Sequence, residues 1–483
     1  MIPKLGAVFY VVGILLMPLG LVMTLPAIVD GSAGNPDWEV YLIAAGVTVF
    51  LGGMLVLANR RQRFSMDRRQ AFLLTTLSWI ILPAFAALPF SFARLELSYS
   101  RAYFEAMSGL TATGATTLIG LDDLPAGILL WRAILQGFGG AGIILLALAV
   151  LPFLRVGGMQ LFRLESSEQG EKVLPRATQI AAMTVSVYLG LVLLSIIAYW
   201  AAGMSFFDAV CHGLTTVSTG GFSTHDASIG FYDSVPIEAV CALFMFLGGV
   251  PIVLVYRLLL RFDWRAFVMD QQVRLFLTVV IAGIVALGVW RILGHGVDPG
   301  ISFRWASFTV ISFVTTTAHA NVAYQEWGSF ADVLLLFAML LGACSGSTSG
   351  GIKMFRFSIL IAVMKAHFRR LEHPHAAVNV TYNKRTVSDG IAQSALLLLL
   401  SFLLAFVVVA LAISAFGYDL LTSLSAAASA IGNAGGGLGP IITNGYFGTM
   451  PEGAIWILSA AMLLGRLELF TVLILLAPRF WRG

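Results

Sequence analysis

The sequence has little charge and little cysteine. Only 11% of its 483 residues are charged, whereas 58% are hydrophobic and the mean hydropathy is +0.89. Soluble proteins carry about 25% charged residues, so this composition excludes a soluble enzyme and a disordered chain. The three cysteines, Cys211, Cys241 and Cys344, are scattered through apolar surroundings and predict neither a disulfide framework nor a metal site. A polytopic helical membrane protein remains.

Catalytic and nucleotide-binding patterns are also missing. The seven histidines form no H-E-x-x-H motif, and no Ser/His/Asp set or carboxylate pair converges within the apolar runs. Every long segment is needed as a membrane span, which leaves no room for a nucleotide-binding fold. The basic residues lie in short linkers rather than in a groove, so nucleic acid is not an expected partner. We therefore expect no enzyme and no cofactor bound by this chain.

Apolar runs of span length occur ten times, and shorter ones lie between them. The ten predicted spans are 6–29, 39–59, 71–92, 126–151, 181–203, 236–260, 274–294, 328–364, 388–415 and 452–478. Four shorter stretches are too short to cross a bilayer of about 30 Å: 100–112, 205–217, 301–316 and 419–432. We interpret these four as re-entrant half-helices.

Charge predicts the orientation. With the N-terminus inside, the cytoplasmic segments are Lys4, 60–69, 155–176, 257–274, 365–389 and the C-terminal tail. They hold 21 of the 29 Lys and Arg residues and 8 of the 25 Asp and Glu residues. Such a bias indicates that both termini are cytoplasmic.

After two leading spans, the order span, half-helix, polar loop, span occurs four times. The sequence thus predicts an all-α polytopic membrane protein with four tandem span–pore-helix–span repeats around a central pore, plus two N-terminal spans. The predicted units are 1–70 for the leading pair and 71–155, 178–262, 272–370 and 386–483 for repeats one to four.

The polar loops that follow the half-helices are 111–120, 217–230, 314–324 and 432–440. Three of them carry glycine at a matching place, Gly114, Gly220 and Gly435, and the other has Ala318. A half-helix that ends at mid-membrane points its negative end at the bilayer centre, and irregular backbone there must line a polar cavity. Four such loops around one axis would form a cation filter of carbonyls. Ordinary extracellular turns are the alternative for any single loop.

Five motifs resemble the TrkH branch of the Trk/Ktr/HKT potassium-transport superfamily. They are SGLTATGATTL (108–118), GGFSTHDASIG (220–230), GACSGSTSGGIKMFR (342–356), GNAGGGLG (432–439) and LLGRLELFTV (463–472). The resemblance implies potassium uptake across the bacterial inner membrane, with K⁺ as the bound and transported ion. It also implies a homodimer that works with a cytoplasmic, nucleotide-binding, TrkA-like regulatory subunit.

The resemblance extends to a potassium-binding filter. Its residues would be Thr111, Ala112, Thr113, Gly114, Ser218, Thr219, Gly220, Thr316, Thr317, Ala318, Asn433, Ala434 and Gly435. Ala318 departs from the glycine that is usual in the family, and His319 follows it. Because a left-handed non-glycine residue costs about 1–2 kcal/mol, we expect a different backbone in the third repeat. His319 is either a pH-sensitive group or a surface histidine at the mouth.

A gate is predicted in the eighth span. Residues 342–352 include four glycines, three serines and a threonine, a composition that favours an unwound intramembrane loop below the filter. A small-residue packing face and a phosphate loop are the alternatives. Arg466, midway along the last span, either faces the pore as an electrostatic barrier or pairs with Glu468 or loop carbonyls. The predicted gate residues are Gly346, Ser347, Thr348, Ser349, Gly350, Gly351, Lys353 and Arg466.

Two further functions remain open from the sequence. Broken helices at the midplane also occur in ion-coupled transporters, so an H⁺- or Na⁺-coupled potassium symporter is one alternative. The other is a less selective K⁺/Na⁺ pathway, because Ala318 replaces the expected glycine.

Overall fold

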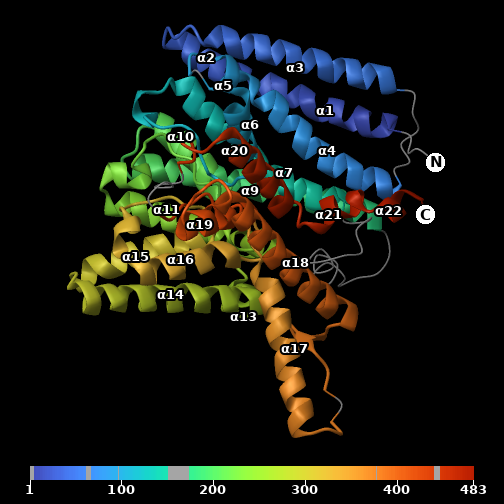
Figure 1. Ribbon diagram of the computed structural model, residues 1–483, viewed down its shortest axis with the longest axis vertical. Coiled ribbons are helices and arrows are strands. Elements are labelled where there is room, and N and C mark those ends of the chain that lie inside the picture. Colours follow the sequence, from blue (N-terminus) through green and yellow to red (C-terminus); the bar gives the residue numbers. More distant parts are fainter. Residues whose placement is uncertain are drawn as a thin grey trace.

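The computed structural model describes residues 5–60, 67–95, 97–150, 173–376, 378–439 and 446–482. Nearly all elements in these ranges are helices, drawn in Figure 1. The helices of the N-terminal part and of repeat one are α1 (Gly6–Val22), α2 (Thr24–Ser32), α3 (Trp38–Asn59), α4 (Arg68–Ala86), α5 (Leu88–Phe92), α6 (Tyr99–Leu110), η1 (Leu121–Asp123) and α7 (Ala126–Val150).

Repeats two and three follow in the same order. Their helices are α9 (Val173–Ala201), α10 (Phe206–Val217), η2 (Ser228–Tyr232), α11 (Val235–Gly248), α12 (Ile252–Arg261), α13 (Trp264–Met269), α14 (Gln271–His295), α15 (Pro299–Val314), η3 (Tyr324–Trp327), α16 (Ser329–Leu341) and α17 (Met354–Glu372). A short antiparallel hairpin, β1 (Thr381–Tyr382) and β2 (Arg385–Thr386), then leads to repeat four. That repeat contains α18 (Asp389–Ser414), α19 (Leu420–Gly432), α20 (Glu452–Arg466), α21 (Phe470–Leu473), η5 (Ile474–Leu476) and α22 (Pro478–Arg482).

Helices occupy all ten predicted spans. Within the described residues, six helical stretches are long and apolar enough to cross a membrane, and two bent pairs bring the total to eight. The pairs α11–α12 and α20–α21 bend by 115° and 104°. The eighth predicted span is interrupted, because α16 ends at Leu341 and α17 begins at Met354. The predicted cytoplasmic segment 155–176 lies largely outside the described residues, as do 61–66.

The four half-helices are α6, α10, α15 and α19, close to the predicted stretches. Three of them begin at a side chain that caps the first turn. Ser205, Asp298 and Asp419 each accept a hydrogen bond from the backbone N–H three residues further on, at Asp208, Ile301 and Thr422. Such caps satisfy N–H groups that a helix leaves unpaired, which fixes where each half-helix starts.

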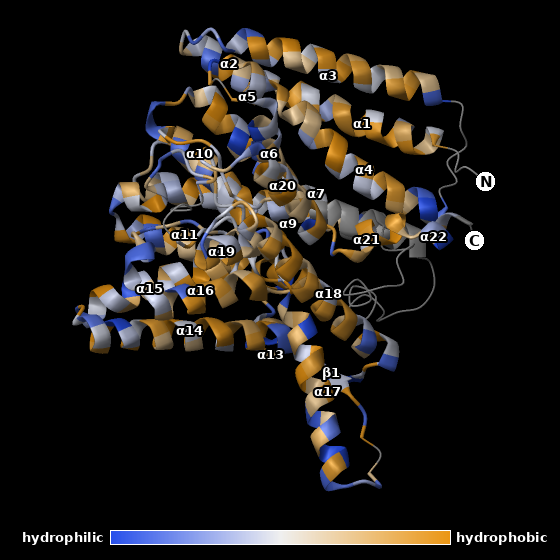
Figure 2. Ribbon diagram, viewed as in Figure 1, coloured by the Kyte–Doolittle hydropathy of each residue, from blue (hydrophilic) through white to orange (hydrophobic). Residues whose placement is uncertain are grey.

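The repeats close into a ring. The second span of each repeat packs against the half-helix of the next: α7 against α10, α11 against α15, α16 against α19, and α20 back against α6. The pair α1 and α3 lies outside this ring along one edge of the molecule (Figure 1). The α1, α3, α14 and α18 ribbons are mostly apolar along their length, and polar residues gather at helix ends and on the projecting end of α17 (Figure 2). This arrangement is the predicted all-α fold of four repeats.

Candidate functional site

Each half-helix ends in the same backbone turn. The second residue after the last helical turn is left-handed: Ala112 (φ 50°), Thr219 (54°), Thr316 (60°) and, in repeat four, the C-cap Asn433 (49°). The next N–H in each repeat returns to a carbonyl five residues back, for example Thr113 to Ser108 and Ala434 to Ser429. A second left-handed residue follows: Gly114 (91°), Gly221 (80°), Ala318 (59°) and Gly435 (65°). We name residues 111–114, 218–221, 315–318 and 432–435 the crossover segments.

This correspondence corrects the sequence alignment of the second repeat by one residue. The sequence pairs Gly220 with Gly114 and Gly435, whereas the backbone pairs Gly221 with them and Gly220 with Thr113. Two adjacent glycines made the sequence ambiguous at this point. The predicted residues Thr111 and Ser218 correspond to each other at the C-caps of α6 and α10.

The crossover segments meet one another. A Cβ added to Gly114 would lie 2.0 Å from the carbonyl oxygen of Gly220, and one on Gly221 would lie 1.7 Å from that of Thr317. A Cβ on Gly435 would lie 2.1 Å from the oxygen of Thr113. Repeat one thus touches repeat two, repeat two touches repeat three, and repeat four touches repeat one through backbone, whereas between repeats three and four a Cβ on Gly436 would meet the side chains of Phe313 and Ala318. Since no side chain fits in these spaces, glycine is required there by packing as well as by its φ.

The third repeat keeps the shared backbone despite Ala318. Its two left-handed residues, Thr316 and Ala318, stand where Ala112 and Gly114 stand in the first repeat, so the expected different backbone is wrong. His319 is 1% exposed and therefore is not a surface histidine. Its ring nitrogens lie 3.2 Å from the hydroxyl of Thr216 and 3.4 Å from that of Ser228. These contacts from the second repeat hold the segment in place.

A buried ion pair stands behind the crossover segments of repeats one and two. Arg132 on α7 and Glu105 on α6 are 1% and 0% exposed, and Arg132 Nε donates to Glu105 at 2.8 Å. Arg132 also donates to the carbonyl of Ser223 at 2.9 Å, just past the second crossover segment. Glu105 accepts from the hydroxyl of Thr116 and the N–H of Thr117. One ion pair therefore ties both repeats together.

Gln136 lies one helical turn further along α7. Its amide nitrogen donates to the carbonyl of Gly220 at 2.7 Å, and its amide oxygen accepts from the N–H of Phe222 at 3.0 Å. The sequence analysis missed Glu105, Arg132 and Gln136. An arginine inside an apolar run such as 126–151 is itself a functional signal, because burying its charge is costly without a partner.

Glycines in the second spans mark equivalent positions of the repeats. A Cβ on Gly139 of α7 would lie 2.1 Å from the carbonyl oxygen of Leu110, the last residue of α6. Gly465 of α20 stands in the same relation to Ile431 at 2.0 Å, and Gly248 of α11 to Val217 at 2.9 Å. The second spans of repeats one, two and four can thus approach the carbonyl ends of their own half-helices closely.

The predicted gate segment is unwound, and it lies against three crossover segments. No helix covers residues 342–353. The hydroxyl of Thr348 donates to the carbonyls of Val217 and Gly248 at 2.9 and 3.0 Å, and Gly350 N donates to the hydroxyl of Thr316 at 2.8 Å. Gly351 N donates to the carbonyl of Gly432 at 2.8 Å. The loop therefore binds the half-helix ends of repeats two, three and four.

Charged side chains hold this loop. Arg466 is 5% exposed and donates to the carbonyls of Thr348 and Gly139, at 3.0 and 3.1 Å. It bonds to loop carbonyls, one of the two orientations considered, and Glu468 instead pairs with Arg356 at 2.6 Å. The ammonium of Lys353 contacts the carbonyl of Ser349. Among the described contacts, Arg466 is thus the link between the loop and the first repeat.

Three acidic residues that follow the crossover segments of repeats one and two differ in their surroundings. Asp122 lies 2.5 Å from His225, and Asp226 accepts from the N–H of Leu121 at 3.1 Å. Asp233 is exposed and lies 3.7 Å from Arg304. The structure brings Asp122 and Asp226 together at the junction of repeats one and two, and leaves Asp233 apart.

A ring of four re-entrant segments inside a bundle of apolar spans defines a multi-pass membrane transport protein rather than an enzyme. The comparison with known proteins agrees: the profile of the TrkH family, described as "Cation transport protein", matches residues 39–482. The chain belongs to this family of Trk-system potassium uptake transporters.

Individual relatives match almost end to end. The chain is 40% identical to the Trk system potassium uptake protein TrkI of Halomonas elongata, over 98% of this chain and 96% of the relative. It is 37% identical to TrkH of Escherichia coli K12, over 99% of both chains. The crystal structure of the potassium transporter TrkH from Vibrio parahaemolyticus matches with a TM-score of 0.91 and 34% identity, covering 99% of this chain and 100% of that one.

Proposed function

We propose that the chain conducts K⁺ through the centre of the ring of crossover segments, with main-chain oxygens replacing the hydration shell of the ion. The observation that carries this proposal is the close approach of Gly114, Gly221 and Gly435 to a backbone oxygen of a neighbouring repeat, at three of the four junctions of the ring. Four half-helices also direct their negative ends toward that ring, which favours a cation there.

In the proposed mechanism, the loop 342–353 closes the pathway below the filter. Its hydrogen bonds to three half-helix ends and to Arg466 hold it across the ring, as expected of a closed state. Opening requires these bonds to break together. A cytoplasmic, TrkA-like nucleotide-binding subunit would drive that step, acting on a homodimer in the bacterial inner membrane with both termini cytoplasmic. The names of the relatives, which place them in Trk systems, support that partner.

Passive flux is favoured over the ion-coupled alternative because all four repeats have one orientation, whereas coupled transporters commonly use inverted pairs. A K⁺ selectivity shared with Na⁺ is the remaining alternative. The normal left-handed backbone at Ala318 argues against a filter distorted at that position.

The test of the filter is growth of a potassium-uptake-deficient bacterium at low K⁺. Gly221→Ala places a Cβ 1.7 Å from a backbone oxygen at φ 80° and should abolish rescue. The matched control is Gly220→Ala, whose Cβ meets the side chain of Gln136 rather than backbone, so a larger share of growth should remain. Equal rescue by Gly221→Ala and the wild type would contradict the proposed ring.

The test of the gate is K⁺ flux in reconstituted vesicles. Arg466→Ala removes both bonds that hold the loop to the first repeat, and deletion of 346–350 removes the loop contacts themselves. Both should raise flux, and flux should follow the K⁺ gradient without needing H⁺ or Na⁺. A folded variant with unchanged or lower flux would count against the gate.

A further inference from the structure

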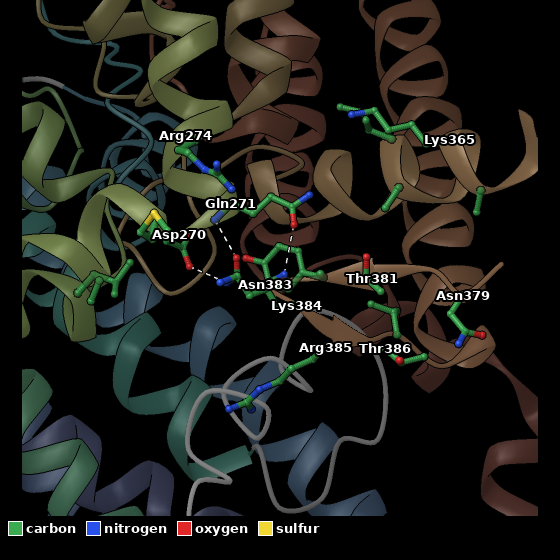
Figure 3. A pocket seen from close by; sticks show the side chains of 18 of the residues that line it. Asp270, Gln271, Arg274, Lys365, Asn379, Thr381, Asn383, Lys384, Arg385 and Thr386 are labelled. Carbon is green, nitrogen blue, oxygen red and sulfur yellow. Dashed lines mark hydrogen bonds between the residues drawn. The ribbon is translucent and has the colours of Figure 1, made fainter. Parts of the chain in front are cut away.

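A cavity whose lining includes no residue of the crossover segments or of the loop 342–353 lies where α12, α13, the start of α14, α17 and the hairpin β1–β2 meet. Its volume is about 1010 Å³, large enough for a small ligand or a lipid headgroup. Figure 3 shows the start of α14, with Asp270, Gln271 and Arg274, against the hairpin turn, and Lys365 of α17 on the other side of the cavity. The cavity belongs to the side of the protein that the charge bias predicts to be cytoplasmic.

The lining of this cavity is strongly basic. Six cationic side chains line it: Arg257, Arg274, Lys365, Arg369, Lys384 and Arg385. Asp270 is the one carboxylate in the lining, and its oxygens are already used. One caps α14 by accepting from the N–H groups of Gln272 and Val273, and the other accepts from Asn383 at 2.8 Å. The positive charge is therefore not balanced from within the cavity.

Four of these cations have no acidic partner among the described residues, whereas Arg257 pairs with Asp263 at 2.7 Å. The N–H of Ala266 and then the Arg257 guanidinium hold the pKa of Asp263 below its usual value, so this pair stays ionised. Among the described residues, Arg274, Lys365, Arg369 and Lys384 form neither an ion pair nor a side-chain hydrogen bond. Four cations thus converge on the cavity without compensation.

The wall that carries Lys384 is fixed in place. Asn383 and Lys384 are both left-handed, with φ of 45° and 62°, as in the tight turn of a two-residue hairpin. Asn383 exchanges two hydrogen bonds with Gln271 and donates a third to Asp270, as Figure 3 shows. These three hydrogen bonds fix the turn to the start of α14. The backbone that carries Lys384 is therefore in position before any ligand binds.

An apolar rim adjoins the basic lining. Met269 lines the cavity and is 61% exposed, and Phe262, Trp264 and Val268, on or just before the same short helix α13, are 83%, 60% and 46% exposed. Exposed aromatic and aliphatic side chains beside cations are typical of a segment that lies at the membrane surface. The cavity therefore offers charge for a headgroup and an apolar path for acyl chains side by side.

We propose that this cavity binds the phosphate of an anionic phospholipid headgroup, with Arg274, Lys365 and Lys384 as its ligands. Basic pockets beside spans on the cytoplasmic face suit such headgroups, because phosphate accepts several charge-assisted hydrogen bonds at once. Free phosphate has the same chemistry without the acyl chains. The apolar rim favours the lipid.

The test titrates the detergent-solubilised full chain with dioleoylphosphatidylglycerol, dioleoylphosphatidylcholine or inorganic phosphate and counts bound molecules by native mass spectrometry. The phosphatidylglycerol should bind at least tenfold more tightly than the phosphatidylcholine. The variant Arg274→Gln/Lys365→Gln should weaken phosphatidylglycerol binding about 30-fold, since each cation near an anionic headgroup contributes about fivefold. The control is Arg261→Gln/Arg265→Gln, which removes the same charge from neighbouring exposed residues outside the lining and should leave binding within about twofold.

Each outcome decides between sources. If the protein binds inorganic phosphate, loses that binding in the cavity variant and shows no preference between the lipids, the cavity is a phosphate site for a soluble ligand. The lipid assignment is then overturned. Equal binding of the two lipids without phosphate binding overturns the proposal, as does equal weakening by the cavity and control variants. A cavity variant that loses only binding to the regulatory subunit also overturns it and identifies a protein contact. Lys384→Gln, on the exposed turn, repeats the test if the double variant does not fold.

Discussion

Two junctions of the ring are built differently although their backbones match. Between repeats one and two, Gln136 bonds to both sides of the peptide run 220–222, and Arg132 with Glu105 supports it from behind. Between repeats three and four the described contacts include no such clamp from the second span, and the hydroxyl of Tyr324 donates to the carbonyl of Gly437 at 3.2 Å instead. Gln136 lies three residues before Gly139 of α7. In repeat three, the residue three before Gly342, the C-cap of α16, is Met339, which is 0% exposed.

The other second spans resemble repeat three rather than repeat one. In repeats two and four, the residues three before Gly248 and Gly465 are Met245 and Met462, and both are fully buried. They occupy the position that Gln136 has in repeat one. Seven residues before the same glycines stand Cys241 and Leu458, where repeat one has Arg132. The second span thus supplies polar bonds to its junction in repeat one and buried apolar side chains in the other repeats, where polar bonds come from other elements, such as Tyr324 to Gly437 and Asn433 to Thr113. A common fold of the repeats does not require a common means of stabilising it.

The largest expected effect comes from breaking the buried ion pair. Arg132→Met leaves Glu105 charged and unpaired at 0% exposure, and breaking such a pair costs about 3–5 kcal/mol. Thermal unfolding in detergent should show the loss. The control is Arg94→Met, whose side chain is 76% exposed and 3.9 Å from Asp37, and it should cost less than about 1 kcal/mol.

The double variant Glu105→Met/Arg132→Met separates the cost of an unpaired buried charge from the loss of the hydrogen bonds that the pair makes to Ser223 and Thr117. It removes both buried charges together, so most of the stability should return. The preference for K⁺ over Na⁺ should nevertheless be lower than in the wild type, because the carbonyl of Ser223 and the N–H of Thr117 have lost their partners. A single variant as stable as Arg94→Met would show that the pair does not hold the junction.

An intermediate effect is expected from Gln136→Met, which gives repeat one the residue of the other three. The carbonyl of Gly220 and the N–H of Phe222 would be left unpaired, at about 1–3 kcal/mol. Met462→Leu at the equivalent position is the control and should cost less than about 1.5 kcal/mol. Inhibition of K⁺ uptake by Na⁺, measured alongside unfolding, should strengthen only in Gln136→Met. Unchanged stability and unchanged competition would contradict a specific role for this clamp.

The two junctions also explain which features the sequence could predict. Span-length apolar runs and half-length runs gave the helices within a few residues, because length and hydropathy alone determine them. The position of Gly221 was missed since Gly220 precedes it and only a backbone angle distinguishes the two. Gln136 was missed because a single amide in a span carries no pattern. Its importance comes from contacts with residues 84 and 86 positions away, which only the folded chain brings together.

The smallest expected effect concerns Ala318, at the junction between repeats three and four. Ala318→Gly removes a left-handed penalty of about 1–2 kcal/mol, and the added freedom of the unfolded chain takes back about 0.4–1 kcal/mol. A net gain of about 0.5 kcal/mol should therefore appear as a slightly higher unfolding temperature. Ala434→Gly is the matched control, since that residue is buried in the ring but is not left-handed, and it should destabilise the protein. If Ala318→Gly destabilised the protein as much as Ala434→Gly, the methyl group of Ala318 would contribute stabilising packing at this junction. At the other junctions glycine occupies the same position, and backbone atoms fill that space.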